Sequence, residues 1–211
     1  MKNNGYRTIQ ICKYHVSPEP VYSFDKYIKA NNRSLLRWGT KSRKLFIQKI
    51  SDHFFYILQL QTPIVDSGFD NTSNLKHKPD LFGNKKKQGS FPGVEEVYYN
   101  VSDIPVPRFL PDTSECRSEL AQYYQSVSRI DQGLARLVEL LKSAGIYDKT
   151  MIVFTSDHGM AFPGAKTTVC KPGLKVPLIV RNPYQNKRGI TSDAMISHVD
   201  ITPSLLDFAG A

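Results

Sequence analysis

The side chains best able to do chemistry follow an apolar run in the last third of the sequence. Ser156-Asp157-His158-Gly159 comes directly after the run 151–155. In open α/β sheets, ligands bind beyond the carboxyl ends of the strands. Asp157 offers carboxylate oxygens and His158 an imidazole nitrogen, so the pair suits a divalent cation, and Gly159 permits a sharp bend. Taken alone, the pair has a second interpretation, a turn aspartate beside a hydrogen-bonded histidine.

Basic side chains at two other places could act on an oxyanion. Lys166 stands eight residues after His158 on a loop preceded by glycine, where a lysine beside a metal site can hold an oxyanion. Lys13 and His15 follow a short apolar segment at 9–12. Residues two apart in an extended chain point to the same side, so these two suit oxyanion binding and proton transfer. The alternative interpretations are a solvent-exposed lysine and a basic edge-strand pair.

Apolar runs predict the strands that would carry these side chains. Phe54–Leu58, Met151–Thr155 and Val176–Val180 are continuous and rich in β-favouring residues, as in strands buried on both faces. A further strand is predicted over Ile9–Cys12 and a helix over Ser42–Ile50. Strands that alternate with helices indicate an α/β fold with a largely parallel sheet flanked by helices.

Two longer helices are predicted from periodicity and capping residues. Asp112 with Glu115 fits a capping box, and Gly145 is a natural stop. Between them, apolar residues recur at steps of three and four on one face: Leu120, Tyr124, Val127, Ile130, Leu134, Leu137 and Leu141. Near the end, Thr202 fits an N-cap with Pro203 at the first helical position, and Gly210 ends the helix.

Composition and charge exclude several classes of protein. The chain has 211 residues, 40% of them hydrophobic, which is enough for a core. It contains no apolar stretch long enough to span a membrane, and its polar first ten residues show no signal peptide. The three cysteines form no C-x-x-C pair, which argues against a disulfide framework or a cysteine zinc site.

The positive charge is concentrated in the first part of the chain. Residues 1–90 hold 16 Lys and Arg against 6 Asp and Glu, whereas residues 91–211 hold 12 against 13, for a net charge of +9 overall. The basic part suits an anionic partner or a merely solvated surface. The stretch 71–111 contains five prolines and little periodicity, so we expect a long loop excursion there.

Taken together, these segments resemble the sulfatase family of the alkaline-phosphatase superfamily, most closely its heparan N-sulfatase branch. The resemblance is densest from about Phe91 onward. It is carried by Gly5–Thr8, Lys13–His15, Phe109–Asp131, Phe154–Lys166, Val176–Arg181 and Val199–Leu206. It implies that residues 1–211 are part of a single catalytic domain with an incomplete sulfatase-like fold. The nucleophile segment and the C-terminal portion are expected to lie outside the sequence given.

The resemblance also implies a role for each candidate residue. Asp157 and His158 match the family's late pair of metal ligands, where the usual ion is calcium. Lys166 and Lys13 match lysines that hold the sulfate, and His15 matches a histidine that assists at the nucleophile. The implied substrate is a sulfated carbohydrate. Family members are mostly exported, periplasmic or lysosomal.

Departures from the family pattern concern the nucleophile above all. The family makes a formylglycine from the Cys or Ser of C/S-x-P-S-R, and this motif is absent from the sequence. Cys12 stands where the family prefers glycine, and Thr62-Pro63-Ile64 lacks a histidine that the family has after its strand. We therefore expect this chain to be inactive alone.

Two further functions remain open at the level of sequence. One is a phosphate-transfer relative in the same superfamily, because Asp-His-Gly also suits phosphomonoesterase metals. The other is a non-catalytic paralogue that binds polyanions, with binding that weakens steeply with salt. No nucleic-acid motif with base-stacking aromatics is evident, so we expect no nucleic-acid partner.

Overall fold

The computed structural model describes residues 1–12, 17–18, 20–29, 39, 43, 53–59, 93–95 and 97–210. Its strands are β1 (Arg7–Cys12), β2 (Lys26–Ile28), β3 (Phe54–Gln59), β4 (Ile152–Thr155) and β5 (Leu178–Arg181). Its α-helices are α2 (Ser114–Ser143), α3 (Lys171–Leu174) and α4 (Ile201–Phe208). Short 3-10 helices are η1 (Lys2–Asn4), η2 (Val101–Asp103), η3 (Tyr147–Lys149) and η4 (His198–Asp200). The predicted helix over Ser42–Ile50 and most of the predicted loop excursion lie outside the described residues.

The strands form two separate ladders in the part of the chain that the structure describes. β1 is the middle strand of a parallel sheet in the order β2-β1-β3, and Ile9 is in register with both Lys26 and Tyr56. β4 and β5 pair with each other and are antiparallel. The parallel sheet agrees with the prediction of an α/β fold, and the antiparallel ribbon is a local departure from it.

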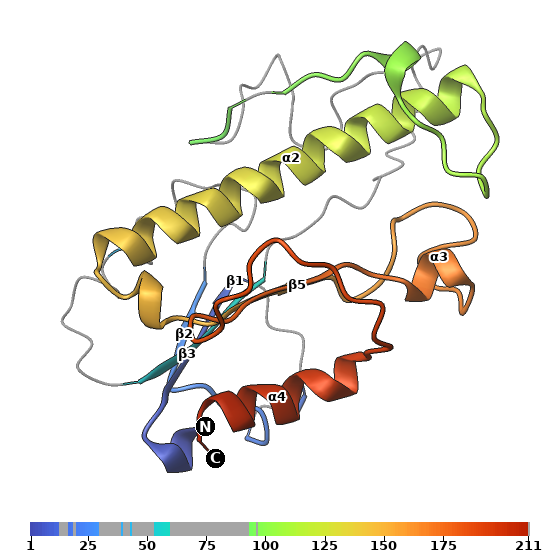
Figure 1. Ribbon diagram of the computed structural model, residues 1–211. Coiled ribbons are helices and arrows are strands. Elements are labelled where there is room, and N and C mark those ends of the chain that lie inside the picture. Colours follow the sequence, from blue (N-terminus) through green and yellow to red (C-terminus); the bar gives the residue numbers. More distant parts are fainter. Residues whose placement is uncertain are drawn as a thin grey trace.

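The long helix α2 crosses most of the molecule in Figure 1, and its two ends pack into two different hydrophobic clusters. At its C-terminal end, Leu140 and Leu141 pack with Ile9 and Ile11 of β1. At its N-terminal end, Leu120 and Ala121 pack with residues beyond both ends of the helix, among them Ile104, Leu110 and Phe162. Thirty residues at about 1.5 Å each give a rod of roughly 45 Å. That length lets one helix hold the sheet and the loop after β4 in fixed positions.

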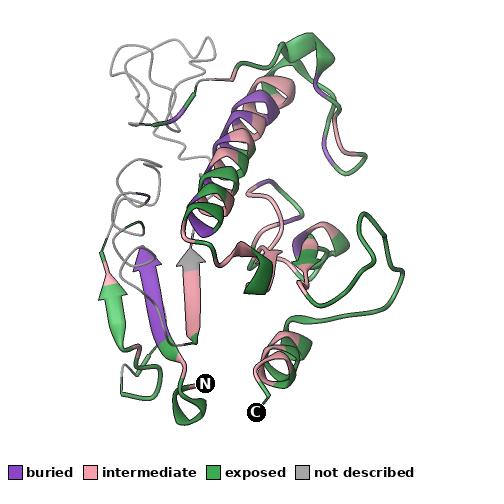
Figure 2. Ribbon diagram, turned by 60° about the vertical axis from the view of Figure 1, so that its left-hand side comes forward, coloured by how far each residue is buried: buried purple, intermediate pink, exposed green. Residues whose placement is uncertain are grey.

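The face that α2 buries differs in its middle from the predicted apolar face. Leu120 and Leu141 are buried as expected, but Val127 is 38% exposed. Figure 2 shows buried residues along α2. The buried side chains at mid-helix are polar: Gln122, Gln125, Ser126 and Arg129. Buried polar groups need hydrogen-bond partners, so this stretch contributes less to stability than an apolar seam of equal length.

Capping residues lie one or more positions away from those predicted. Thr113 is the N-cap of α2 and accepts a hydrogen bond from the Cys116 amide, while Asp112 pairs with Arg117 instead. The last helix begins earlier than Thr202, because Ser197 and Asp200 form a capping box around η4 that leads into α4. The predicted stops at Gly145 and Gly210 are confirmed, since both are left-handed at φ 70° and 71°.

The prediction that Met151–Thr155 is a central strand buried on both faces is wrong for the described residues. Every residue of β4 is only half-buried, and Ile179 and Val180 of β5 are at least half exposed. A continuous apolar run does not by itself reveal how many neighbours a strand has. Here the described neighbour of β4 is β5 alone.

A carboxylate network at the start of β1 gives stability that depends on pH. The Thr8 amide and hydroxyl donate to Asp25 at 2.7 and 2.8 Å, and Lys2 lies 3.2 Å from the same carboxyl group. These hydrogen bonds lower the pKa of Asp25 to about 2. Because the folded-state pKa is depressed, the contribution is complete above the ordinary value near 3.8 and is lost as pH falls through about 2.

We therefore expect the melting temperature to fall between pH 4 and pH 2, and to fall less in Asp25→Asn. Circular dichroism melts at half-unit pH steps measure this difference. Equal slopes in the two proteins over that window would contradict the assigned network.

Candidate metal and sulfate site

The Asp157–His158 pair lies where β4 ends, as the sequence predicted. Thr155 closes the strand, and its hydroxyl donates to the Pro177 carbonyl at 2.9 Å. The Ser156 hydroxyl then donates to the His158 carbonyl at 2.8 Å and tightens the bend. His158 Nε2 lies 3.6 Å from Asp157 Oδ1, with the Asp157 side chain 66% exposed. A carboxylate and an imidazole thus converge at one accessible point.

Two glycines allow the chain after this pair to lie directly against α3. The Gly159 amide donates to the Gly173 carbonyl at 2.9 Å. A Cβ on Gly159 would lie 1.9 Å from the Pro172 carbonyl oxygen, and one on Gly173 would lie 2.3 Å from that of Ala165. Neither glycine has a positive φ. The bend at Gly159 was predicted, but the need for glycine comes from backbone contact, which no local sequence pattern reveals.

A loop that folds back on itself brings the backbone of Lys166 close to the Asp157–His158 pair. Its amide donates to the Met160 carbonyl at 3.0 Å, only two residues beyond His158. The Ala165 amide donates to the Phe162 carbonyl at 3.1 Å, and the Thr168 amide to the Ala165 carbonyl at 3.1 Å. The backbone of the half-buried Lys166 is therefore fixed beside the chain that leaves the Asp157–His158 pair.

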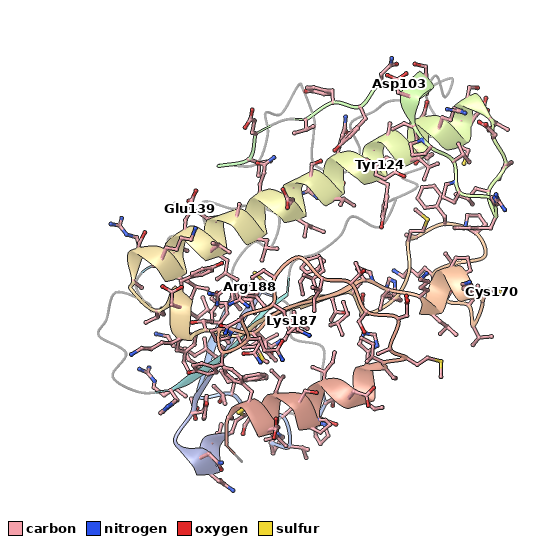
Figure 3. All side chains as sticks on the ribbon, in the orientation of Figure 1. Asp103, Tyr124, Glu139, Cys170, Lys187 and Arg188 are labelled. Atoms are coloured by element: carbon pink, nitrogen blue, oxygen red, sulfur yellow. The ribbon has the colours of Figure 1, made fainter. Side chains whose placement is uncertain are left out.

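Apolar contacts fasten this loop to α2. Phe162 is 8% exposed and meets Tyr123 edge-on, with ring centroids 5.9 Å apart. Ala165, next to Lys166, is fully buried. Burial also raises the pKa of Tyr123, so its hydroxyl stays neutral against Phe162. Cys170, labelled in Figure 3, is the N-cap of α3 and closes the loop.

Two non-glycine residues in the described part of the chain have a left-handed backbone, and each of them is next to a candidate lysine. Thr167 follows Lys166 at φ 65°, and Cys12 precedes Lys13 at φ 79°. Cys12 is buried, and its carbonyl accepts a hydrogen bond from the Tyr27 hydroxyl. Such conformations cost about 1–3 kcal/mol and persist where the surroundings impose them, often at functional sites. Position 12 has a positive φ, which glycine adopts without strain, and this explains why the family prefers glycine there.

Relief of the strain at Thr167 has a predictable effect on stability. Asparagine tolerates the left-handed region, so Thr167→Asn should raise the free energy of unfolding by about 1 kcal/mol. Thr167→Val keeps the β-branch and loses the hydroxyl that donates to the Lys166 carbonyl, so it should give no gain. Urea unfolding measures both. If Thr167→Asn is no more stable than Thr167→Val, the proposed backbone strain at position 167 is refuted.

His198, the first residue of η4, has a structural role. Its Nε2 lies 2.9 Å from the Ser156 carbonyl oxygen, 42 residues away in the sequence. A carbonyl can only accept, so this nitrogen carries the hydrogen. This hydrogen bond joins the segment that leads into α4 to Ser156, the residue before Asp157. It therefore helps to hold the bend that carries Asp157 and His158 in position.

Lys13 and His15 lie outside the described residues, so their predicted roles stay predictions. Among the residues that the structure does describe, no group of three or more His, Cys, Asp or Glu side chains could hold a metal ion. Asp157 and His158 are two such side chains, one fewer than such a group needs. In the same residues, no helix is long and apolar enough to cross a membrane.

The structure described so far is an α/β fold in which an aspartate-histidine pair follows β4 and a loop brings the backbone of Lys166 back toward it. The sequence profile of the sulfatase family matches residues 1–211. The chain belongs to the sulfatase family. The family generally uses a divalent metal.

Individual relatives agree with this assignment. The chain is 33% identical to the N-sulphoglucosamine sulphohydrolase of Homo sapiens over 97% of its own length and 42% of that protein. It is 27% identical to an ulvan-active sulfatase of Formosa agariphila, over 100% of this chain and 37% of that one. It is also 30% identical, over 47% of its length and 20% of the relative, to the multifunctional alkaline phosphatase superfamily protein PehA of Trinickia caryophylli. The chain spans about two fifths of the length of the first two.

Proposed function

We propose that this chain supplies the metal-ligand pair and a sulfate-holding lysine of a sulfatase that cleaves a sulfuric ester or sulfamate on a sulfated sugar. The observation that carries the proposal is the hydrogen bond from Lys166 to Met160, which returns the lysine backbone to the Asp157–His158 bend. The named substrates of the relatives, N-sulphoglucosamine and ulvan, support a sulfated carbohydrate as the substrate class.

Each described residue would contribute in a distinct way. Asp157 and His158 would hold a divalent ion, which when bound polarises a sulfate oxygen and stabilises the developing charge. Lys166 would place its ammonium group against another sulfate oxygen, where negative charge grows as the S–O or S–N bond breaks. Lys13 would do the same, and His15 would assist the nucleophile, in keeping with the family pattern.

The nucleophile is the part of the reaction that this chain does not supply. No Cys or Ser here lies in the C/S-x-P-S-R pattern from which the family makes its formylglycine. In our proposal, a separate upstream segment provides that residue together with the remaining metal ligands. The chain by itself binds sulfate and metal weakly and does not turn over.

A phosphate-transfer activity is the second candidate, because Asp-His-Gly also suits phosphomonoesterase metals and PehA is among the matched relatives. Titration of the isotope-labelled chain with sodium sulfate, and separately with sodium phosphate, distinguishes the two. NMR shifts should appear at 164–168 at lower concentrations of sulfate. Shifts only at other surface lysines would overturn the site, and a stronger response to phosphate would favour the second candidate.

A further inference from the structure

The imidazole of His158 is held in one orientation and one tautomer. Its Nδ1 lies 2.8 Å from the Gly159 carbonyl oxygen. That oxygen can only accept a hydrogen bond, so Nδ1 carries the hydrogen and Nε2 has the lone pair when the ring is neutral. Nε2 is also the nitrogen that faces Asp157 Oδ1, at 3.6 Å. The ring therefore presents a metal-binding nitrogen beside a carboxylate oxygen.

Three hydrogen bonds of the neighbouring residues hold the backbone that carries the His158 ring. The Gly159 amide is bonded to Gly173, the His158 carbonyl accepts from the Ser156 hydroxyl, and the Ser156 carbonyl is bonded to His198. Partners that fix the tautomer and direction of a ligating histidine are the usual outer shell of a metal site. The bend thus keeps Nε2 in place through hydrogen bonds of the protein itself.

The separation of the two donor atoms fits a shared ion. A tetrahedral zinc ion with bonds of about 2.0–2.1 Å separates two of its ligands by roughly 3.4 Å. The 3.6 Å between Nε2 and Oδ1 agrees with that value to within a few tenths of an ångström. A calcium ion with cis ligands at about 2.4 Å gives a similar separation, so distance alone does not select the metal.

The chemical types of the two donor atoms, a nitrogen and an oxygen, do select the metal. Calcium takes oxygen ligands, whereas imidazole nitrogen suits zinc and the other late first-row divalent ions. We propose that the Asp157–His158 pair binds a zinc-class divalent ion in preference to calcium, the usual ion of the family. This inference rests on the proposed function, in which these two residues are metal ligands.

Imidazole-selective ¹⁵N NMR of the intact chain tests the preference at the ring itself. Zinc chloride and calcium chloride are titrated separately at constant ionic strength, and the Nε2 resonance of His158 is followed. We expect zinc to shift this resonance at a concentration at least about tenfold lower than any at which calcium perturbs the backbone amides of Asp157 and His158. His53, exposed and far along the sequence, serves as control, so His53→Gln should leave the His158 response unchanged.

A substitution at His158 tests whether the type of donor atom, rather than the position of the site in the fold, sets the metal preference. His158→Asn replaces the nitrogen donor with an amide oxygen and should weaken zinc binding at least about tenfold at Asp157 while leaving calcium binding unchanged or stronger. Circular dichroism confirms that the variant folds. If calcium perturbs the pair at lower concentrations than zinc, the preference is wrong and the metal-ligand role stands. If neither ion perturbs the pair, both the preference and the metal part of the proposed function are refuted.

Discussion

Gly159→Ala is expected to lower the free energy of unfolding by at least about 3 kcal/mol, among the larger effects of a single substitution. The added Cβ would lie 1.9 Å from the Pro172 carbonyl oxygen, far inside van der Waals contact, and 2.9 Å from its carbon. Both are backbone atoms, so no side chain can rotate away. The clash would break the Gly159–Gly173 hydrogen bond that joins the bend after β4 to α3.

A second glycine provides the matched control for this substitution. Gly189 has φ 63°, and a Cβ added to it would meet no atom within 4 Å. Gly189→Ala therefore costs only left-handed backbone strain, about 1–2 kcal/mol. Urea unfolding followed by circular dichroism compares the two variants with the parent chain. Equal losses of stability at Gly159 and Gly189 would show that the close approach to Pro172 is absent in solution.

Lys166→Ala is expected to weaken sulfate binding by about tenfold to a hundredfold. A hydrogen bond to a charged group contributes about 1.5–3 kcal/mol, and every 1.4 kcal/mol is tenfold in affinity. The loop 160–168 holds the lysine backbone in place before the anion arrives, so little ordering offsets that gain. Lys166→Arg keeps the charge and should retain most of the binding.

The measurement is the sulfate concentration at half-maximal NMR shift, with sodium chloride used to keep ionic strength constant. Lys187→Ala is the control, because it removes the same charge from an exposed position in the connection between β5 and α4 (Figure 3). Lys187→Ala should change the midpoint less than about twofold, as expected for a screened surface charge. If the two alanine variants weaken binding equally, Lys166 acts only through net charge.

Local patterns in the sequence predicted the elements that carry the candidate site. The apolar runs around Ile9, Phe54 and Phe154 are strands, and the periodic stretch between Asp112 and Gly145 is a helix. The prediction that Asp157 and His158 follow a strand directly is confirmed, because strand ends are marked by the change from apolar to polar residues. These features depend on neighbours within a few residues.

Features that depend on distant parts of the chain were not predictable in the same way. Periodicity could not show that α2 buries Gln125 and Arg129, because burial there depends on what packs against the helix. The contact of Gly159 with Pro172 joins the bend after β4 to helix α3, and the left-handed Thr167 is imposed by bonds around it. A β-branched residue in that conformation runs against its local preference, so only the surrounding loop reveals it.

Sulfate release by the purified chain tests the central claim most directly. The claim is that these residues hold the sulfate and the metal of a sulfatase while the nucleophile lies in a separate segment. The assay offers N-sulfated and 6-O-sulfated glucosamine with zinc or calcium present, and measures free sulfate. We predict no release above the protein-free blank. Release that Lys166→Ala abolishes would contradict the claim, since it would place a working nucleophile within these 211 residues.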